Sequence, residues 1–166
     1  IDGGATVEVI TNNNKPLANS IATDMADYIW SVREEFAHGE CIMPKEAVKK
    51  TAEAIANNQT PVALGDYSDR PGDATWILQQ LIDQKVDGVL FGTLADAPTL
   101  EKMKERKMKA GDVFDMEVGG YTGEQAGKPV HINGTVKFFG KTWSYDKVAV
   151  IDFGNHNTLI LTPAYT

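Results

Sequence analysis

The hydrophobic pattern up to about Gly111 alternates between short apolar runs and stretches with helical periodicity. A β-branched run at residues 6–11 is followed by a long helical stretch that begins near Pro16 and ends before Gly39. Its apolar positions recur every three or four residues, as one face of a helix requires: Leu17, Ile21, Met25, Tyr28, Ile29, Val32 and Phe36. We therefore expect a strand and a long amphipathic helix at the start of the chain.

The same alternation continues through residues 44–108. It predicts a helix that starts near Pro44 and carries Ala47, Val48, Ala52 and Ile55 on its buried side. Further helices are predicted at 73–84 and 96–108, with apolar strands at 61–66 and 86–94. The strand at 86–94 is almost uniformly apolar, which is typical of a strand that is covered on both faces. Asp96 is placed to cap the last of these helices.

After Gly111 the period changes from 3.6 to 2, which predicts strands at 113–118, 130–138, 147–153 and 158–162. In the second of these strands one face carries Val130, Ile132, Val136 and Phe138. Short loops between alternating strands are typical of an antiparallel sheet. We therefore predict an α/β (α+β) fold in a single domain spanning residues 1–166. Its front half alternates strand and helix in a mixed sheet, and its C-terminal half is antiparallel β.

Composition narrows the class of protein. The 166 residues carry 16 Lys and Arg against 23 Asp and Glu, a formal charge of −7, and 42% are hydrophobic. This argues against disorder and against a nucleic-acid partner, which would require a basic face. No apolar run could span a membrane and no signal segment opens the chain, while the lone cysteine, Cys41, cannot form an internal disulfide. We expect a cytoplasmic protein, and the start at Ile1 suggests a piece of something larger.

The stretch from Gly65 to Thr75 concentrates the candidate chemistry, because it follows an apolar strand and opens a helix. Backbone N–H groups at the helix start, with Arg70 beside them, would suit an anion or a carboxylate. Asp66 and Asp69 could instead hold a hard cation or orient a neighbouring group. The candidate ligand-binding residues are Asp66, Ser68, Asp69, Arg70, Gly72, Asp73 and Thr75.

A purely structural interpretation of this stretch is equally open. Asp73 could cap the helix that follows it, and residues 69–72 could form a turn. Arg70 could do no more than neutralise the neighbouring aspartates.

Metal and nucleophile motifs are weak in this chain. His38 and Cys41 have a compact spacing, but no second pair completes a zinc set. Neither Cys41 nor Ser68 lies in a nucleophile motif, and there is no Walker loop or GxGxxG. We therefore expect neither a metal site nor catalytic residues in this chain.

Two motifs resemble the C-terminal domain of the microcystinase C (MlrC) family. Residues 66–78, DYSDRPGDATWIL, resemble a shortened form of the family's loop Asp-x-Ser-Asp-Asn-Pro-Gly-Gly-Gly-x-Pro-Gly-Asp-x-Thr, with Arg70 where Asn is commoner. Residues 118–130 resemble its Gly-Gly-Lys-Thr…His-Gly-x-Pro-Val segment, with Tyr121 in place of Lys and Ala126 where a His is often found. The resemblance covers nearly the whole chain.

The resemblance implies the function and the partners. Members of that family are two-domain zinc metallopeptidases or their relatives, and their zinc ligands lie in an N-terminal domain that this chain lacks. The chain would then be an accessory domain that flanks the active-site cleft. Its partners would be the N-terminal metal-binding domain, a peptide or other small-molecule substrate, and, in a homo-oligomer, a second copy of the chain.

Two other interpretations stay open at this point. The chain could be a self-sufficient module that binds an anionic small molecule in the same crevice, with Arg70 as the clamp. It could also be a structural domain that only packs against its partner, and that would expose an apolar patch in isolation.

Overall fold

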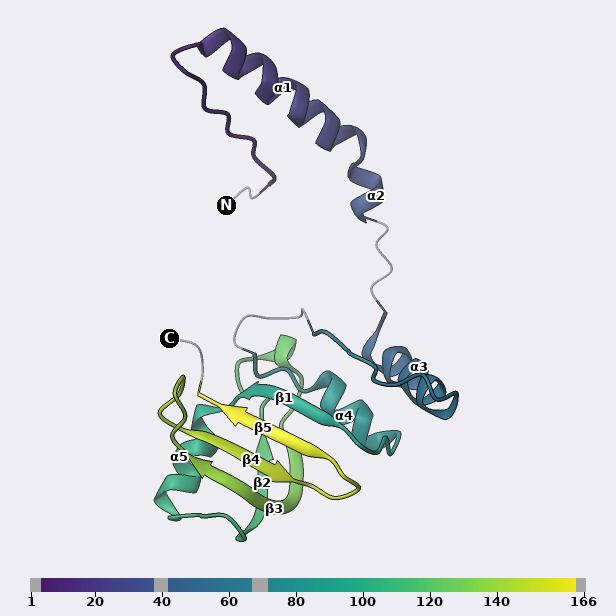
Figure 1. Ribbon diagram of the computed structural model, residues 1–166, viewed down its shortest axis with the longest axis vertical. Helices are drawn as coiled ribbons and strands as arrows, with labels where there is room; N and C mark the ends of the chain where they lie inside the picture. The colour runs from purple at the N-terminus through teal and green to yellow at the C-terminus, as the bar shows by residue number, and fades with distance from the viewer. Residues whose placement is uncertain (1–3, 38–41, 67–71, 164–166) are drawn as a thin grey trace. The chain divides into compact units, whose positions relative to one another are not determined.

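The computed structural model describes residues 4–37, 42–66 and 72–163, and the chain divides into two compact units, residues 1–41 and 42–166. Helices predominate in the front half and a mixed five-stranded sheet follows toward the C-terminus (Figure 1). The predicted mixed α/β class is therefore confirmed. None of the described helices is long and apolar enough to cross a membrane.

The first unit contains helices α1 (Lys15–Ser31) and α2 (Arg33–Ala37). The Asn14 side chain accepts a hydrogen bond of 3.1 Å from the Leu17 amide and caps α1, and Pro16 lies in its first turn. The predicted strand at 6–11 was wrong: these residues have no regular secondary structure. A strand requires a hydrogen-bonded neighbour, and the described part of this unit contains none.

The second unit is built on a sheet with the order β1-β5-β4-β3-β2. Its strands are β1 (Leu90–Ala95), β2 (Val113–Val118), β3 (Val130–Gly140), β4 (Val148–Asp152) and β5 (Thr158–Thr162). The β1–β5 pair is parallel. The other three pairs are antiparallel, as the change of period after Gly111 predicted. β1 and β2 are consequently the two edge strands.

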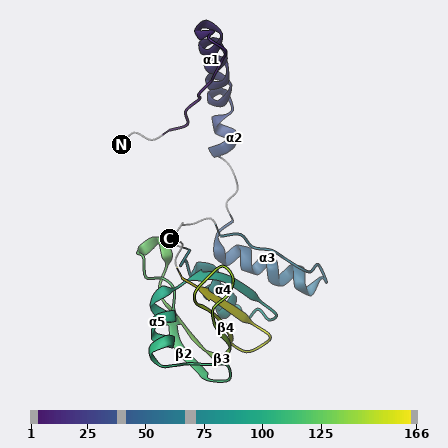
Figure 2. The same cartoon turned by 60° about the vertical axis from the view of Figure 1, so that its left-hand side comes forward.

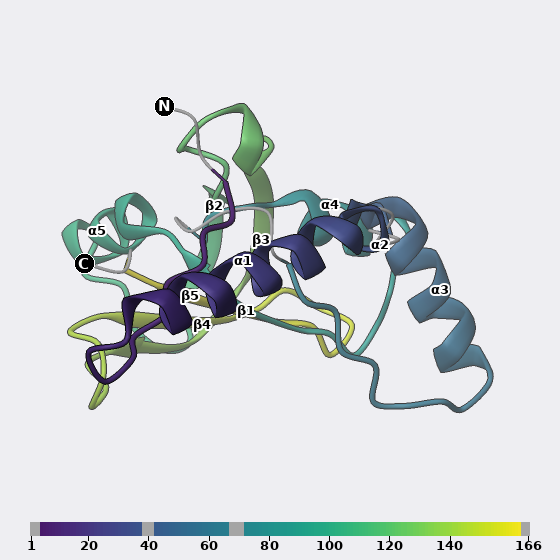
Figure 3. The same cartoon turned by 90° about the horizontal axis from the view of Figure 1, so that it is seen from above.

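Three helices and a short turn of 3₁₀ helix complete this unit: α3 (Pro44–Ala56), α4 (Trp76–Asp83), α5 (Ala97–Glu105) and η1 (Glu124–Ala126). α5 packs against β2 and β5, and Figure 2 shows α5 beside β2. α3 lies beside α4 (Figure 3). The main core is formed by one face of the sheet together with α4 and α5, and its largest fully buried side chains include Phe114, Leu100, Met103, Ile132, Ile151 and Leu159. A smaller cluster joins α3 to α4 through Val48 and Leu81.

Four predicted elements of this unit differ from the structure. Residues 61–66 form no strand, and α4 begins at Trp76 rather than at residue 73. β1 is not covered on both faces, because the Leu90 side chain is 71% exposed. Phe138 is exposed although Val136 is buried, because the β3–β4 register shifts between these two residues and a bulge turns the strand.

Candidate functional site

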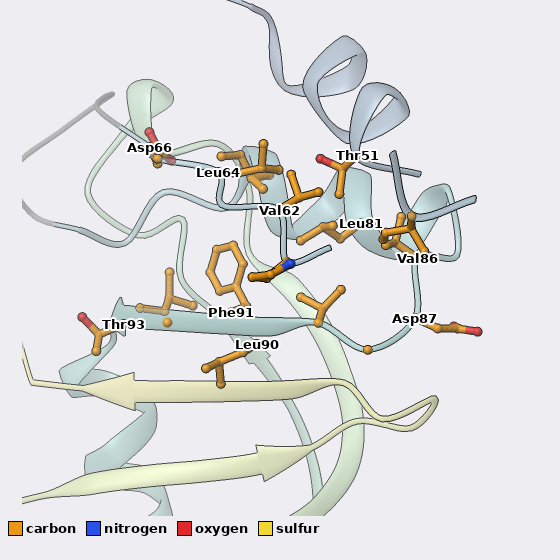
Figure 4. Close-up of a pocket in the computed structure, with 18 of the residues that line it drawn as sticks. Thr51, Val62, Leu64, Asp66, Leu81, Val86, Asp87, Leu90, Phe91 and Thr93 are labelled. Carbon is orange, nitrogen blue, oxygen red and sulfur yellow. The ribbon is translucent and has the colours of Figure 1, made fainter. Parts of the chain in front are cut away.

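A pocket of about 630 Å³ follows the free edge of β1. Residues 60–66 line one side of it and β1 lines the other, with Ile77 and Leu81 of α4 also contributing (Figure 4). Figure 4 shows the Phe91 ring directed from β1 toward Val62. The volume falls in the range of small-molecule pockets, and most of the lining is apolar.

The predicted site residues separate into three groups in the structure. Asp66 and Gly72 line the pocket. Asp73 and Thr75 are buried and contact the loop after β2 instead. Ser68, Asp69 and Arg70 lie outside the described residues, so ligand binding by this set stays a prediction.

The Asp73 carboxylate is a loop clamp. One oxygen accepts hydrogen bonds from the backbone amides of Tyr121 at 2.8 Å and Thr122 at 3.0 Å, and the other accepts one from the Thr122 hydroxyl at 2.6 Å. The backbone carbonyl of Asp73 accepts a fourth from the Gly120 amide. At 3% exposure, Asp73 holds residues 120–122 in place, and it does not cap α4.

Thr75 makes a second connection between the same two segments. Its hydroxyl lies 2.7 Å from the Lys128 carbonyl and 3.1 Å from the Ala126 carbonyl, and its amide donates to the Ala126 carbonyl. The Trp76 indole donates to the neighbouring Gln125 carbonyl at 2.9 Å. The side chains of Asp73, Thr75 and Trp76, which are close together in sequence, therefore fix residues 73–76 to residues 120–128.

Asp96 holds the other end of this loop. One carboxylate oxygen caps α5 by accepting from the Thr99 amide at 2.9 Å, as predicted, and the second accepts from the Gly119 amide at 2.9 Å. Gly119 has a φ of +61°, and a Cβ there would lie 2.6 Å from Thr75 Cγ2. Only glycine meets both the dihedral angle and the space.

Tyr121 lies at the surface of this junction, and its hydroxyl donates to the Glu117 carbonyl at 3.0 Å. Partial burial raises the pKa of the Tyr121 phenol, with the Asp96 and Glu117 carboxylates acting in the same direction. Tyr121 is therefore a neutral hydrogen-bond donor at neutral pH.

The described residues offer no set of metal ligands. Among residues 4–37, 42–66 and 72–163, no three His, Cys, Asp or Glu side chains come together in a way that could hold an ion. Asp73 and Asp96 are the most deeply buried of the described carboxylates, and their oxygens are directed at backbone amides. His38 and Cys41 lie outside the described residues.

Residues 70–162 match the family described as the MlrC C-terminus, more than half of the chain. The chain belongs to the MlrC C-terminal domain family. The Asp73, Thr75, Asp96 and Gly119 contacts all lie within the matched region, so they join segments of one family domain. A comparison with curated proteins gave no match.

A solved structure shares the fold. The chain superposes with a TM-score of 0.66 on the crystal structure of a candidate metallopeptidase from Mesorhizobium sp. BNC1, at 23% identity. The match covers 90% of this chain and 32% of that one. This MlrC C-terminal domain thus spans about a third of the length of that protein, and the two share this fold.

Some features of this MlrC C-terminal domain have little signal in the sequence. The loop partners of Asp73 lie 48 and 49 residues away, and no local pattern connects them. A usable signal was the pair Gly119–Gly120 directly after a strand, since adjacent glycines mark a tight backbone approach. The sequence did not predict that Leu90 and Phe91 line a pocket, because an apolar run is equally typical of a buried central strand.

Proposed function

We propose that this chain is the accessory C-terminal domain of an MlrC-like metallopeptidase, and that it flanks the active-site cleft without being catalytic on its own. The observation that carries the proposal is that hydrogen bonds from two places fix the loop at residues 119–128, which we call the loop junction. Asp73 and Thr75 fix residues 120–128 through hydrogen bonds, and Asp96 fixes Gly119. A loop pair built this firmly would present a fixed wall to a neighbouring domain.

The partner in this proposal is an N-terminal metal-binding domain in the same parent protein. That domain would supply the zinc, and its substrate would be a peptide or another small molecule. Among the described residues of this chain, no three His, Cys, Asp or Glu side chains come together to hold a zinc ion. What the chain contributes is shape and positioning at the edge of the cleft.

The direct test compares this chain alone with the parent protein of which it would form the C-terminal part. We expect zinc content near one ion or more per molecule and peptide hydrolysis for the parent, and neither for the chain alone. Stoichiometric zinc together with turnover in the isolated chain would refute the accessory role.

A loop variant of the parent sharpens this test. Thr75→Val would loosen residues 120–128, so peptide hydrolysis should fall while zinc content stays the same. Thr75→Ser is the matched control, because it retains the hydroxyl. If both variants hydrolyse peptide as well as the parent, the loop junction does not shape the cleft.

Binding of an anionic ligand by residues 66–75 remains a prediction that depends on Arg70. The charged side chains among the described pocket-lining residues are Asp66 and Asp87, which do not themselves favour an anion. A thermal-shift screen against phosphates, dicarboxylates and dipeptides tests it, and Arg70→Ala should abolish any stabilisation that appears.

A further inference from the structure

Helix α1 presents an apolar surface that the described part of its own unit leaves exposed. Its large apolar side chains on one side fall within an arc of about 120°, with Ala18 as the other residue inside that arc. We call these residues the α1 stripe: Leu17, Ile21, Met25, Tyr28 and Ile29. No residue of α1 is buried, and Tyr28 is 68% exposed. Since helices in proteins gain most of their stability by burying such a face, the α1 stripe requires a partner.

The width of the α1 stripe indicates a broad partner surface rather than a single helix. Two paired helices bury a narrow seam, with apolar residues at two positions of each heptad. An arc wider than about 100° is instead typical of a helix that packs on a sheet or on the core of a globular domain. The opposite side of α1 carries Asn19, Thr23 and Asp27. The helix therefore has one side suited to docking and one suited to solvent.

Residues 6–11, which precede α1, also lack a partner. Their sequence, TVEVIT, is rich in the β-branched residues that favour strands. Burial alternates along them, because Val7 and Val9 are half-buried whereas Glu8 and Ile10 are exposed. Among the described residues, the backbone groups of residues 6–10 make no backbone hydrogen bond. The segment thus has the composition of a strand and the free backbone groups through which a strand pairs.

The segment and the helix together form one βα unit, because only residues 12–14 separate them (Figure 1). In the turn between them, the Asn13 amide donates to the Thr11 carbonyl at 2.9 Å. In α/β proteins, the helix that follows a strand packs on a face of the sheet to which that strand belongs. One sheet would therefore supply both missing contacts, a neighbouring strand for residues 6–11 and an apolar face for the α1 stripe.

The comparisons with known proteins indicate which part of a larger protein holds that sheet. The family match begins at residue 70, so this βα unit lies outside the matched region. The fold shared with the Mesorhizobium protein nevertheless covers 90% of this chain, more than residues 42–166 alone can supply, so it includes part of residues 1–41. About two thirds of that protein lies beyond the match, which is enough chain for another α/β domain.

We propose that residues 6–11 and α1 dock as a βα unit onto the N-terminal domain of the parent protein. Residues 6–11 pair with an edge strand of that domain's sheet, and the α1 stripe covers the face of the sheet beside this strand. The partner is thus an α/β domain with an unpaired strand edge and an apolar sheet face next to it. The inference rests on the proposed accessory role, because it assumes the N-terminal domain, and it adds the surface that joins the two.

Hydrogen–deuterium exchange tests this docking by comparing the chain alone with the parent protein. The amides of residues 6–11 and of α1 should exchange at least about tenfold more slowly in the parent, because there they are held in a sheet and in a helix packed on it. The amides of β4 and β5 are the internal reference and should exchange at similar rates in both proteins. Equal exchange of residues 6–11 and of α1 in the two proteins would overturn the proposal.

Matched variants of the parent locate the contact on α1. Ile21→Gln places a polar amide in the α1 stripe and should speed the exchange of residues 6–11 about tenfold, because it removes apolar surface from the interface. Thr23→Gln places the same side chain on the opposite side of the helix and should leave the exchange unchanged. If Ile21→Gln fails to fold by circular dichroism, Met25→Gln replaces it. Unchanged exchange in a folded stripe variant, or an equal effect of Thr23→Gln, would contradict the proposal.

The chain alone decides between the N-terminal domain and a second copy as the partner. Light scattering should show no dimer that depends on the α1 stripe. A dimer that Ile21→Gln dissociates and Thr23→Gln does not would overturn the proposal in favour of a second copy. Zinc content and peptide hydrolysis of the same samples keep the accessory role separate. Turnover by the chain alone refutes that role, whereas the exchange comparison still reports whether the βα unit docks.

Discussion

The Asp73 carboxylate accepts a 2.6 Å hydrogen bond from the Thr122 hydroxyl, joining the segment after the pocket to the loop after β2. The same carboxylate accepts hydrogen bonds from the backbone amides of Tyr121 and Thr122. Three donors on one buried carboxylate make this a rigid connection, because every alternative arrangement would leave buried polar groups without partners.

Replacing Asp73 by Asn should therefore destabilise the chain. An Asn amide offers one acceptor oxygen and turns an NH₂ group toward the donors of residues 121–122, so we expect a loss of about 2 kcal/mol in the free energy of unfolding. Urea denaturation measures it. Asp115→Asn is the control, because Asp115 is exposed beside His131 and its substitution should change stability by less than about 0.5 kcal/mol. Equal effects at both positions would contradict the clamp.

Thr75 provides a second test of the same junction. Thr75→Val keeps the shape but leaves the carbonyls of Ala126 and Lys128 without their hydroxyl donor, which should cost about 1–3 kcal/mol. Thr75→Ser retains the donor and should recover most of that loss. The two variants are compared by their denaturation midpoints, and a Ser variant as unstable as the Val variant would show that the methyl group, rather than the hydroxyl, matters here.

A comparison of Gly119 with Gly154 separates two causes of instability, the strain of a positive φ and the lack of space for a Cβ. Gly119→Ala should be strongly destabilising, because the new Cβ would lie 2.6 Å from Thr75 Cγ2 in addition to the strain of a φ of +61°. Gly154→Ala has a φ of +89° with nothing within 4 Å of its Cβ, so it carries the dihedral strain alone. We expect thermal unfolding to show a clearly larger decrease for Gly119→Ala, and equal decreases would argue that residue 119 is not tightly enclosed.

The sequence predicted those elements whose signal is local. The strands at 113–118 and 158–162 match because their alternation directly reflects one buried face, with Phe114, Met116 and Val118 buried on β2. The Asp96 cap was likewise predictable, because the Thr99 amide that donates to its carboxylate is only three residues away. Such features depend on neighbours within a single turn or strand.

The features that were missed depend on distant neighbours. Residues 61–66 have the composition of a strand, but a strand also needs a hydrogen-bonded neighbour. Asp73 looked like a helix cap because its true partners lie 48 residues on. In the candidate site, Asp66 and Gly72 line a pocket although no strand precedes them, and ligand binding there stays a prediction. The sequence pattern could not show that Asp73 and Thr75 face the loop junction instead.

The Glu101–Lys147 pair gives a pH-dependent prediction. The hydrogen bond from Lys147 lowers the pKa of the exposed Glu101 carboxyl below its ordinary value of 4.5. A carboxyl whose pKa is lower in the folded state stabilises the fold fully above its unfolded pKa, and loses that effect as the pH falls through the folded pKa. Lys147→Gln should therefore lower the melting temperature slightly at pH 7 and not at pH 2.5. Asp115→Asn on the other edge serves as a background. A difference between wild type and Lys147→Gln that persists unchanged at pH 2.5 would show that the lysine acts through packing rather than through its charge.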